Sequence, residues 1–238
     1  MKKNNRTVSW AFIVIFIGLF SACAVVPKPD IANPVRTVVI LPFSNLSNNV
    51  DAPKNVRTLL AEQLKAKFYK VVPIDEVDQA LADEFGITLG EQIREIELRQ
   101  IAAKIEADAY VYGDISYYDS LTAGIINTNR VAAKLQMIRT GTEIVLWSSN
   151  IGVKSESKSG GSLGALASLT SAVSDAKDED IQWITIESEQ GGDGSLLGNL
   201  ISGLVKTAIS SAMGINLDRE TRAFVAHSSV SLRNGPGF

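Results

Sequence analysis

Hydrophobic and polar positions along the chain change their spacing several times, and each change predicts a different element. VRTVVILPF (residues 35–43) is a β-branched run that ends near Pro42, which predicts a buried strand. Past a polar loop, Pro53 opens a predicted helix. Its apolar face is spaced as one side of a helix and consists of Val56, Leu59, Leu60 and Leu64.

A second set of helices lies between two further predicted strands. FYKVVP (68–73) indicates a short strand, after which Asp75 is the expected N-cap of a helix and Asp78 its capping-box partner. A third helix is expected over about 98–105 because its apolar residues recur at helical spacing. The segment ADAYVYGDISYYDSL (107–121) then predicts a strand with Tyr110 and Tyr112 on the same face.

Beyond residue 126 the pattern alternates with a period of two. NRVAAKLQMI (129–138) and TEIVLWSSNIGV (142–153) flank a turn that contains Gly141, which predicts an antiparallel hairpin. The expected order is β-α-β-α-α-β-β-β, followed by C-terminal helices. This order predicts an α/β (α+β) fold with a mixed sheet, in which helix-linked parallel strands precede a meander.

The remaining third of the chain has a different composition. Residues 154–195 are rich in Ser, Gly and Ala and are expected to form a flexible polar insertion, with a short helix at 163–173 and one strand at 183–187. Residues 196–213 have a wide apolar face at helical spacing. A last helix is expected at about 217–231. The candidate interaction residues of the apolar helix are Leu197, Ile201, Val205 and Ile209.

The amino terminus has the pattern of an export signal. A basic start precedes eleven uncharged residues (10–20), too few to span a bilayer but typical of a secretory signal peptide. LFSAC (19–23) then resembles the lipobox of bacterial lipoproteins, although Phe20 stands where leucine is commonest. The prediction is cleavage between Ala22 and Cys23 and lipidation of Cys23; the alternative is a buried core thiol.

Cysteine count and the following residues agree with this interpretation. Cys23 is the chain's one cysteine, so the mature body would have no free thiol in an oxidising compartment. Ala24 follows where the inner-membrane retention signal would place Asp, so the anchor is expected in the outer membrane, with the domain on the periplasmic face. The predicted organisation is a signal peptide (1–22), a lipidated cysteine with a proline-rich tether (23–34), an α/β core (35–153), the insertion (154–195) and C-terminal helices (196–238).

Charge and side-chain chemistry exclude several functions. The formal net charge is −3, and it becomes more negative when the basic signal peptide is removed, so neither nucleic acid nor anionic lipid is an expected partner. The one histidine, His227, has no evident catalytic partner, so a Ser-His-Asp or Cys-His site is not expected. The acidic run 178–180 lacks the spacing of a calcium loop. We expect no enzyme activity, no cofactor and no metal.

Several segments together resemble a known family. They are RTVVILPFSNLSNNVDAP, YKVVPIDEVDQAL, KIEADAYVYGDI, the hairpin ending in VLWSS, GSLLGNLISGLVK and the closing NGPGF. Their order resembles bacterial lipoproteins of unassigned activity that are grouped with TolB amino-terminal, CsgG and LpoB-like domains. The resemblance implies an envelope α/β module that works by protein–protein contact in transport, secretion or assembly.

Two functions of different kinds follow from the sequence. The first is a lipid-anchored, non-catalytic interaction module whose partners are envelope proteins, a second copy of itself, or a CsgG-like secretion component. The second is a periplasmic lipoprotein that binds a small ligand in a cleft near residues 44–49 and 114–118, at the carboxyl ends of the predicted strands. A hydrolase is disfavoured because no nucleophile and base can be paired.

Overall fold

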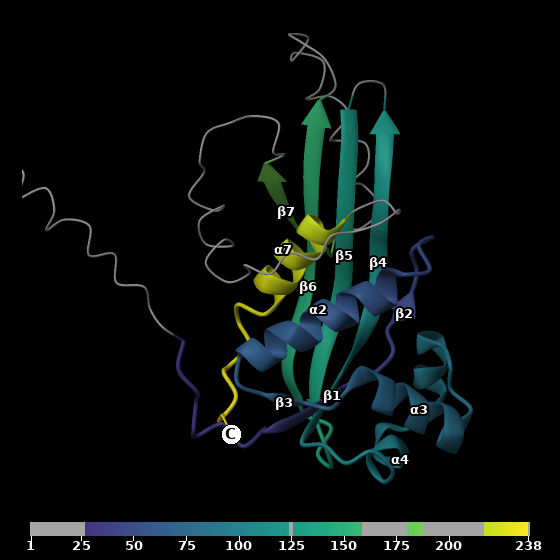
Figure 1. Cartoon of the computed structure of the whole chain (residues 1–238), viewed down its shortest axis with the longest axis vertical. Helices are drawn as coiled ribbons and strands as arrows, with labels where there is room; N and C mark the ends of the chain where they lie inside the picture. Colours follow the sequence, from purple (N-terminus) through teal and green to yellow (C-terminus); the bar gives the residue numbers. More distant parts are fainter. Residues whose placement is uncertain (1–26, 124–125, 159–179, 188–216, 238) are drawn as a thin grey trace, which may run out of the picture.

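The computed structural model describes residues 27–123, 126–158, 180–187 and 217–237. Within these residues the strands form one seven-stranded sheet in the order β3-β1-β4-β5-β6-β7, with β2 paired beside β4 (Figure 1). The strands are β1 (Thr37–Ile40), β2 (Ser44–Asn45), β3 (Lys70–Val71), β4 (Ala109–Ala123), β5 (Ile126–Arg139), β6 (Val145–Lys158) and β7 (Gln182–Glu187). The helices are α2 (Ala52–Ala66), α3 (Ile74–Phe85), α4 (Leu98–Ala102) and α7 (Asp218–Ser228), with a 3₁₀ segment η2 (Gly90–Glu95).

The sheet is mixed, which confirms the predicted fold class. β1 pairs in parallel with β3 and β4, as expected for strands joined by helices. β4, β5 and β6 form an antiparallel meander. The strand expected at 183–187 lies in β7, which pairs in parallel with β6. The two-residue strand β2 was not predicted, and it extends the parallel pairing to Asp114 and Ile115 of β4.

Helices cover both faces of the lower part of the sheet (Figure 1). α2 and α7 pack on one face, where α7 contacts β5 and β6. The core on this face is built around fully buried side chains that include Phe43, Leu60, Leu64, Leu135 and Phe224. α3, η2 and α4 cover the opposite face, where Tyr110 is fully buried and Tyr112 packs against the same cluster. The predicted shared face of these two tyrosines is therefore confirmed.

The start of α3 differs from the prediction. The helix begins at Ile74 with Pro73 as the N-cap residue, and no side chain caps it. Asp75 is therefore not the N-cap, and Asp78 makes no capping box, because its carboxylate binds Arg57 of α2 instead. A tertiary ion pair has taken the place of the predicted local hydrogen bonds to the backbone. The helix ends at Gly86, whose φ of +67° lies in the left-handed region that glycine tolerates.

Three other boundaries also differ. α4 ends at Ala102, so the buried Ile105 lies in the turn that follows rather than in the helix. β6 continues through residues 154–158, which were expected to begin the flexible insertion. Residues 30–34, expected in the tether, are bonded to the folded domain. The helices predicted at 163–173 and 196–213 lie outside the described residues.

Candidate functional site

A groove of about 1180 Å³ lies between α2 and α3, past the carboxyl ends of β1 and β3. We call it the α2–α3 groove. Pro42, Phe43 and Val72, which directly follow the two strands, contribute to its lining. α2 lines one side of the groove with two adjacent rows of residues that are spaced four apart. One row is Lys54, Thr58 and Glu62, and the other is Arg57, Ala61 and Lys65. This position is where open α/β sheets commonly bind their ligands.

A buried ion pair connects the two helices within the groove. The Arg57 side chain is 7% exposed, and its Nη1 and Nη2 donate to the two oxygens of Asp78 over 3.0 and 2.8 Å. Nη2 also donates to the carbonyl of Ile40 at the end of β1, over 2.9 Å. The bidentate arrangement fixes α3 against α2 and both against the sheet. The pair therefore links the two walls of the groove to each other and to the end of β1.

The charges that line the groove are mixed. Lys54, Arg57 and Lys65 contribute positive charge, and the acidic lining residues are Glu62, Asp75, Asp78 and Glu91. Glu91 also accepts a hydrogen bond from the backbone of Asn45 over 2.8 Å, which holds the outer rim. Mixed charges beside apolar side chains suit a polypeptide segment better than a polyanion. The groove is thus a candidate protein-contact surface.

The small-ligand cleft predicted from the sequence is only partly formed. Residues 44–49 and 114–118 are brought together, but Ser44 and Asn45 of β2 pair directly with Asp114 and Ile115, so the two segments adjoin as strands instead of flanking a cleft. Arg94 forms an ion pair with Asp114 at the same place. Asn45 does line the α2–α3 groove, whereas residues 114–118 do not. The cleft predicted at the strand ends is therefore displaced toward β3.

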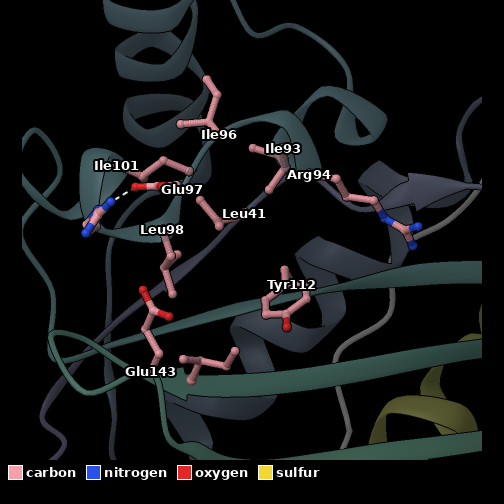
Figure 2. Close-up of a pocket in the computed structure, with 11 residues that line it drawn as sticks. Leu41, Ile93, Arg94, Ile96, Glu97, Leu98, Ile101, Tyr112 and Glu143 are labelled. Carbon is pink, nitrogen blue, oxygen red and sulfur yellow. Dashed lines mark hydrogen bonds and ion pairs between the residues drawn. The ribbon is translucent and has the colours of Figure 1, made fainter.

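A smaller pocket of about 490 Å³ lies between η2 and α4 on one side and Leu41, Tyr112 and Ile138 of the sheet region on the other. Figure 2 shows its side chains converging from the turn around Ile93 and Leu98, from Leu41 and from Tyr112. Its lining is mostly aliphatic, and charged groups, among them Glu97 and Glu143, stand at its margin. Burial raises the pKa of Tyr112, whose hydroxyl donates to Gln136 over 2.9 Å. We call this the apolar pocket.

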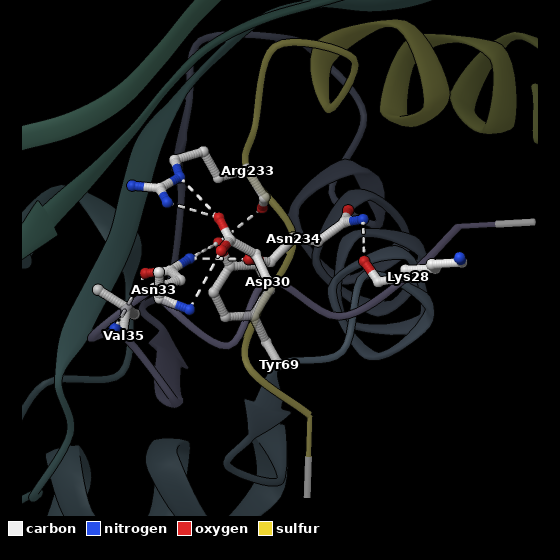
Figure 3. A network of polar contacts seen from close by, with 8 residues as sticks. Lys28, Asp30, Asn33, Val35, Tyr69, Arg233 and Asn234 are labelled. Atoms are coloured by element: carbon white, nitrogen blue, oxygen red, sulfur yellow. Dashed lines mark hydrogen bonds and ion pairs between the residues drawn. The ribbon is translucent and has the colours of Figure 1, made fainter.

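The two ends of the described chain are joined by a polar network, which we call the terminal clasp (Figure 3). Asp30 donates its backbone N–H to the carbonyl of Gly235 over 2.8 Å and pairs its carboxylate with Arg233. Asn234 donates its side-chain amide to the carbonyl of Lys28, also over 2.8 Å. The closing NGPGF segment therefore holds the start of the domain.

A buried tyrosine forms the centre of the clasp. Tyr69 is 1% exposed; its hydroxyl donates to the carbonyl of Arg233 over 2.7 Å and accepts from the Asn33 amide over 3.1 Å. Burial raises the pKa of Tyr69, although the bond from Asn33 opposes this. The Asn33 amide also donates to the carbonyl of Asn234 over 2.9 Å. Because each polar group has a partner, the network is stable although it is buried.

Most of the residues predicted from the sequence to carry function lie outside the α2–α3 groove, the apolar pocket and the terminal clasp. Ala22 and Cys23, the predicted cleavage and lipidation residues, fall outside the described residues. So do Leu197, Ile201, Val205 and Ile209 of the predicted interaction helix. His227 lies in the last turn of α7 and is half-buried. Its position agrees with a structural role.

The described part of the chain has neither a metal site nor a membrane-spanning helix. Among residues 27–123, 126–158, 180–187 and 217–237, no group of His, Cys, Asp and Glu side chains is arranged to hold a metal ion. Nor does any helix in those ranges have the length and apolar character needed to cross a bilayer.

Sequence reasoning missed Arg57 and the clasp. Arg57 follows Val56 on the buried side of α2, and a basic residue at that position is a weak signal of a buried ion pair. Its partner lies 21 residues away and could not be identified without the structure. The clasp joins residues about 200 positions apart, such as Asn33 and Asn234, and no local pattern predicts such a contact.

Comparison with known proteins identifies the class as a lipoprotein. The family model described as "Putative lipoprotein GNA1162-like" matches residues 31–182. The chain belongs to this GNA1162-like family. No curated protein sequence matches it.

Several solved structures are also similar to this chain. Lipoprotein GNA1162 from Neisseria meningitidis is 21% identical, with a TM-score of 0.47 over 59% of this chain and 96% of that chain. The PelC dodecamer from Paraburkholderia phytofirmans is 14% identical, with a TM-score of 0.34 over 59% and 84%. The LpoB C-terminal domain from Salmonella enterica is 17% identical, with a TM-score of 0.33 over 55% and 87%.

Proposed function

We propose that this protein is a lipid-anchored, non-catalytic module that binds an envelope protein through the α2–α3 groove. The anchor is an acylated Cys23, and the domain is held at the outer membrane on its periplasmic face. The partner is a component of transport, secretion or envelope assembly. A second copy of the chain or a CsgG-like secretion component remains within this proposal.

The observation that carries the proposal is the groove itself. It is large enough for a polypeptide segment, and its mixed charges and apolar floor are typical of transient protein contacts. The Arg57–Asp78 pair keeps its two walls in fixed positions before a partner arrives. Preorganisation of this kind lowers the entropic cost of binding.

Site-specific photocrosslinking in cells tests the groove. A photoreactive amino acid replaces Thr58, which is exposed and lines the groove. The matched control position is Asp83, which is exposed on α3 but outside the groove. We expect an adduct with a defined envelope protein from position 58, identified by mass spectrometry, and much less of it from position 83.

A charge reversal makes the test specific. Lys65→Glu changes the charge of an exposed groove residue without touching the core, and it should weaken the adduct formed at position 58. Equal adducts from positions 58 and 83, or an adduct indifferent to Lys65→Glu, would argue against the groove as the binding surface.

The apolar pocket supports a second candidate, a lipoprotein that binds a small apolar ligand. Its volume of about 490 Å³ lies within the range of small-molecule sites. Small aliphatic and aromatic compounds should then raise the melting temperature of the protein. Leu98→Arg, at a half-buried lining position, should abolish that rise, and a broad compound series with no effect on the wild type would remove this candidate.

A further inference from the structure

We infer that the tip of the β5–β6 hairpin, residues 140–146, contacts the lipid bilayer beside the anchor and so orients the domain with its long strands pointing away from the membrane. The inference rests on the proposed acylation of Cys23. The inference concerns a surface of the described domain. The contact between the hairpin tip and the bilayer could be absent even if Cys23 is acylated.

The first argument is the length of chain between the anchor and the domain. The terminal clasp begins at Lys28, whose carbonyl is bonded to Asn234. Four residues lie between Cys23 and Lys28, so five Cα–Cα steps join the two. A fully extended chain of that length spans no more than about 18 Å, whatever its conformation. The headgroup layer of one leaflet is itself about 5–8 Å deep, so the clasped end of the domain must lie against the membrane surface.

The second argument is that the hairpin tip lies at this same end. Figure 1 shows the β5–β6 turn and the last described residues of the carboxyl terminus at one end of the sheet. Hydrogen bonds connect the tip to the chain that enters β1. Thr140 donates its N–H to the Asp108 carbonyl over 3.0 Å, and Asp108 donates its N–H to the Thr37 carbonyl over 2.9 Å. The Asp108 carboxylate accepts from the N–H of Thr37 over 2.7 Å.

The third argument is the apolar character of the tip. Ile144, Val145 and Leu146 are consecutive aliphatic residues that are 57%, 50% and 40% exposed. A register shift between Met137 and Ile138 places an extra residue in β6 at this point, so both faces of the strand start carry aliphatic groups. Three adjacent exposed aliphatic side chains are unusual on a surface that faces only water.

A fourth exposed aliphatic residue, Ile31, belongs to the segment that leads from the clasp to β1. It is 85% exposed. Aliphatic residues on a peripheral surface bind by burying their side chains at the boundary between headgroups and acyl chains. A lipid surface thus accounts for both sets of exposed residues.

Charge selects the bilayer over a strongly charged partner. The charged residues of this end, in the clasp and in the segments around β1, β3, β4 and the hairpin tip, are the cations Lys28, Arg36, Lys67, Lys70, Arg139 and Arg233 and the anions Asp30, Glu106, Asp108 and Glu143. Six cations and four anions leave a small net charge of +2, so burial of the aliphatic groups contributes more to the contact than electrostatic attraction to anionic lipid. Glu143 precedes Ile144 and would remain among the headgroups.

Fluorescence quenching in vesicles tests the inference on the full-length, lipidated protein. Ile144→Cys and, as a control, Val50→Cys each carry an environment-sensitive thiol dye. Val50 is also aliphatic and 87% exposed, but it lies beyond the carboxyl end of β1, away from the clasp. The vesicles contain phosphatidylethanolamine and phosphatidylglycerol, with a fraction of the lipid carrying a quencher on its acyl chains.

We expect the dye at position 144 to shift its emission to shorter wavelength and lose intensity to the quencher, and the dye at position 50 to do neither. If both dyes are unquenched although the protein floats with the vesicles, the orientation is wrong while the anchor stands. The same conclusion follows if the undyed Ile144→Cys variant forms disulfide-linked dimers on oxidation by air, because a second copy then covers the tip. A protein that does not float with the vesicles, or whose Cys23 takes up dye when no cysteine has been added, contradicts the anchor and with it this inference.

Discussion

Arg57 carries the most consequential side chain of the groove. It is buried, it bonds Asp78 through two nitrogens and Ile40 through one, and its Nε has no hydrogen-bond partner among the described residues. A buried guanidinium depends on its carboxylate, because an unpaired charge in that position is costly. Asp78 is 45% exposed, so water offsets part of that cost.

Asp78→Ala should therefore lower the free energy of unfolding by about 1.5–3 kcal/mol, the range for hydrogen bonds to charged groups. Asp83→Ala is the control on the same helix, since Asp83 accepts one exposed bond from Gln79 worth about 0.2–0.5 kcal/mol. Urea denaturation of both variants measures the difference. Equal stabilities would contradict a structural role for the ion pair.

Because of Tyr110, the free energy of unfolding of the domain should depend on pH in the alkaline range. Burial raises the pKa of Tyr110 to about 12 from an ordinary value of 10.0. As pH rises through 10, the unfolded chain ionises first while the folded state keeps its proton until about 12. The free energy of unfolding should thus fall between pH 10 and 12.

Tyr110→Phe should reduce that fall, and it should also lower stability near neutral pH by about 1 kcal/mol because the hydroxyl donates to the carbonyl of Ile105. Denaturant melts at pH 8 and at pH 11 test both effects. A wild type equally stable at the two pH values would refute the prediction. Burial also raises the pKa of Tyr69 and Tyr112, so part of the decline should remain in the variant.

At the scale of elements, two glycines in the strands on either side of β5 differ in how well they should tolerate a side chain. A Cβ at Gly113 of β4 would lie 2.1 Å from the Lys134 carbonyl oxygen, a backbone atom of β5. At Gly152 of β6 it would lie 2.6 Å from the ring of Trp183, a side chain that is only half-buried. The first obstacle is part of the sheet, whereas the second can rotate.

Gly113→Ala should therefore destabilise the protein by about 1–3 kcal/mol or more, and Gly152→Ala by less. Thermal melts of the two variants give the comparison, in which each serves as the other's control. The reverse order would show that Trp183 is held more firmly than its exposure indicates.

The terminal clasp is an element that ties the start of the domain to its end. Tyr69→Phe removes a hydroxyl that makes two hydrogen bonds, so residues 30–35 should exchange their amide hydrogens faster. Tyr112→Phe, which loses one hydrogen bond at a distant site, is the control. Hydrogen exchange measured by mass spectrometry tests this, and unchanged exchange at Asp30 and Val35 would contradict it.

The sequence predicts an element well when contacts between residues close in the chain determine it, and poorly when contacts between distant residues do. The β-branched run of β1, the alternating residues of β5 and β6 and the turn at Gly141 determine local structure and were predicted. The capping role of Asp75 and Asp78 was wrong, because Asp78 is used by Arg57 across 21 positions. β2 and the clasp were missed because neither has a periodic pattern, and pairing with β4 or with residues 233–237 defines them.

At the scale of the whole molecule, the predicted mixed sheet and the family resemblance are both confirmed, while the role of the molecule remains a proposal. The α2–α3 groove was displaced from the predicted cleft because β2 occupies part of the strand ends. What the protein binds depends on side chains brought together by the fold. Where it is held depends on a local motif around Cys23, which the sequence alone can indicate.

The central claim is that acylated Cys23 holds this domain at the membrane. The most direct test is the mass of the amino-terminal peptide of the protein extracted from membranes, together with the Cys23→Ser variant. We predict that residues 1–22 are absent, that Cys23 carries acyl chains, and that the variant remains an unprocessed precursor without them. A membrane-bound wild type that retains residues 1–22, or that starts elsewhere with an unmodified Cys23, would contradict the account.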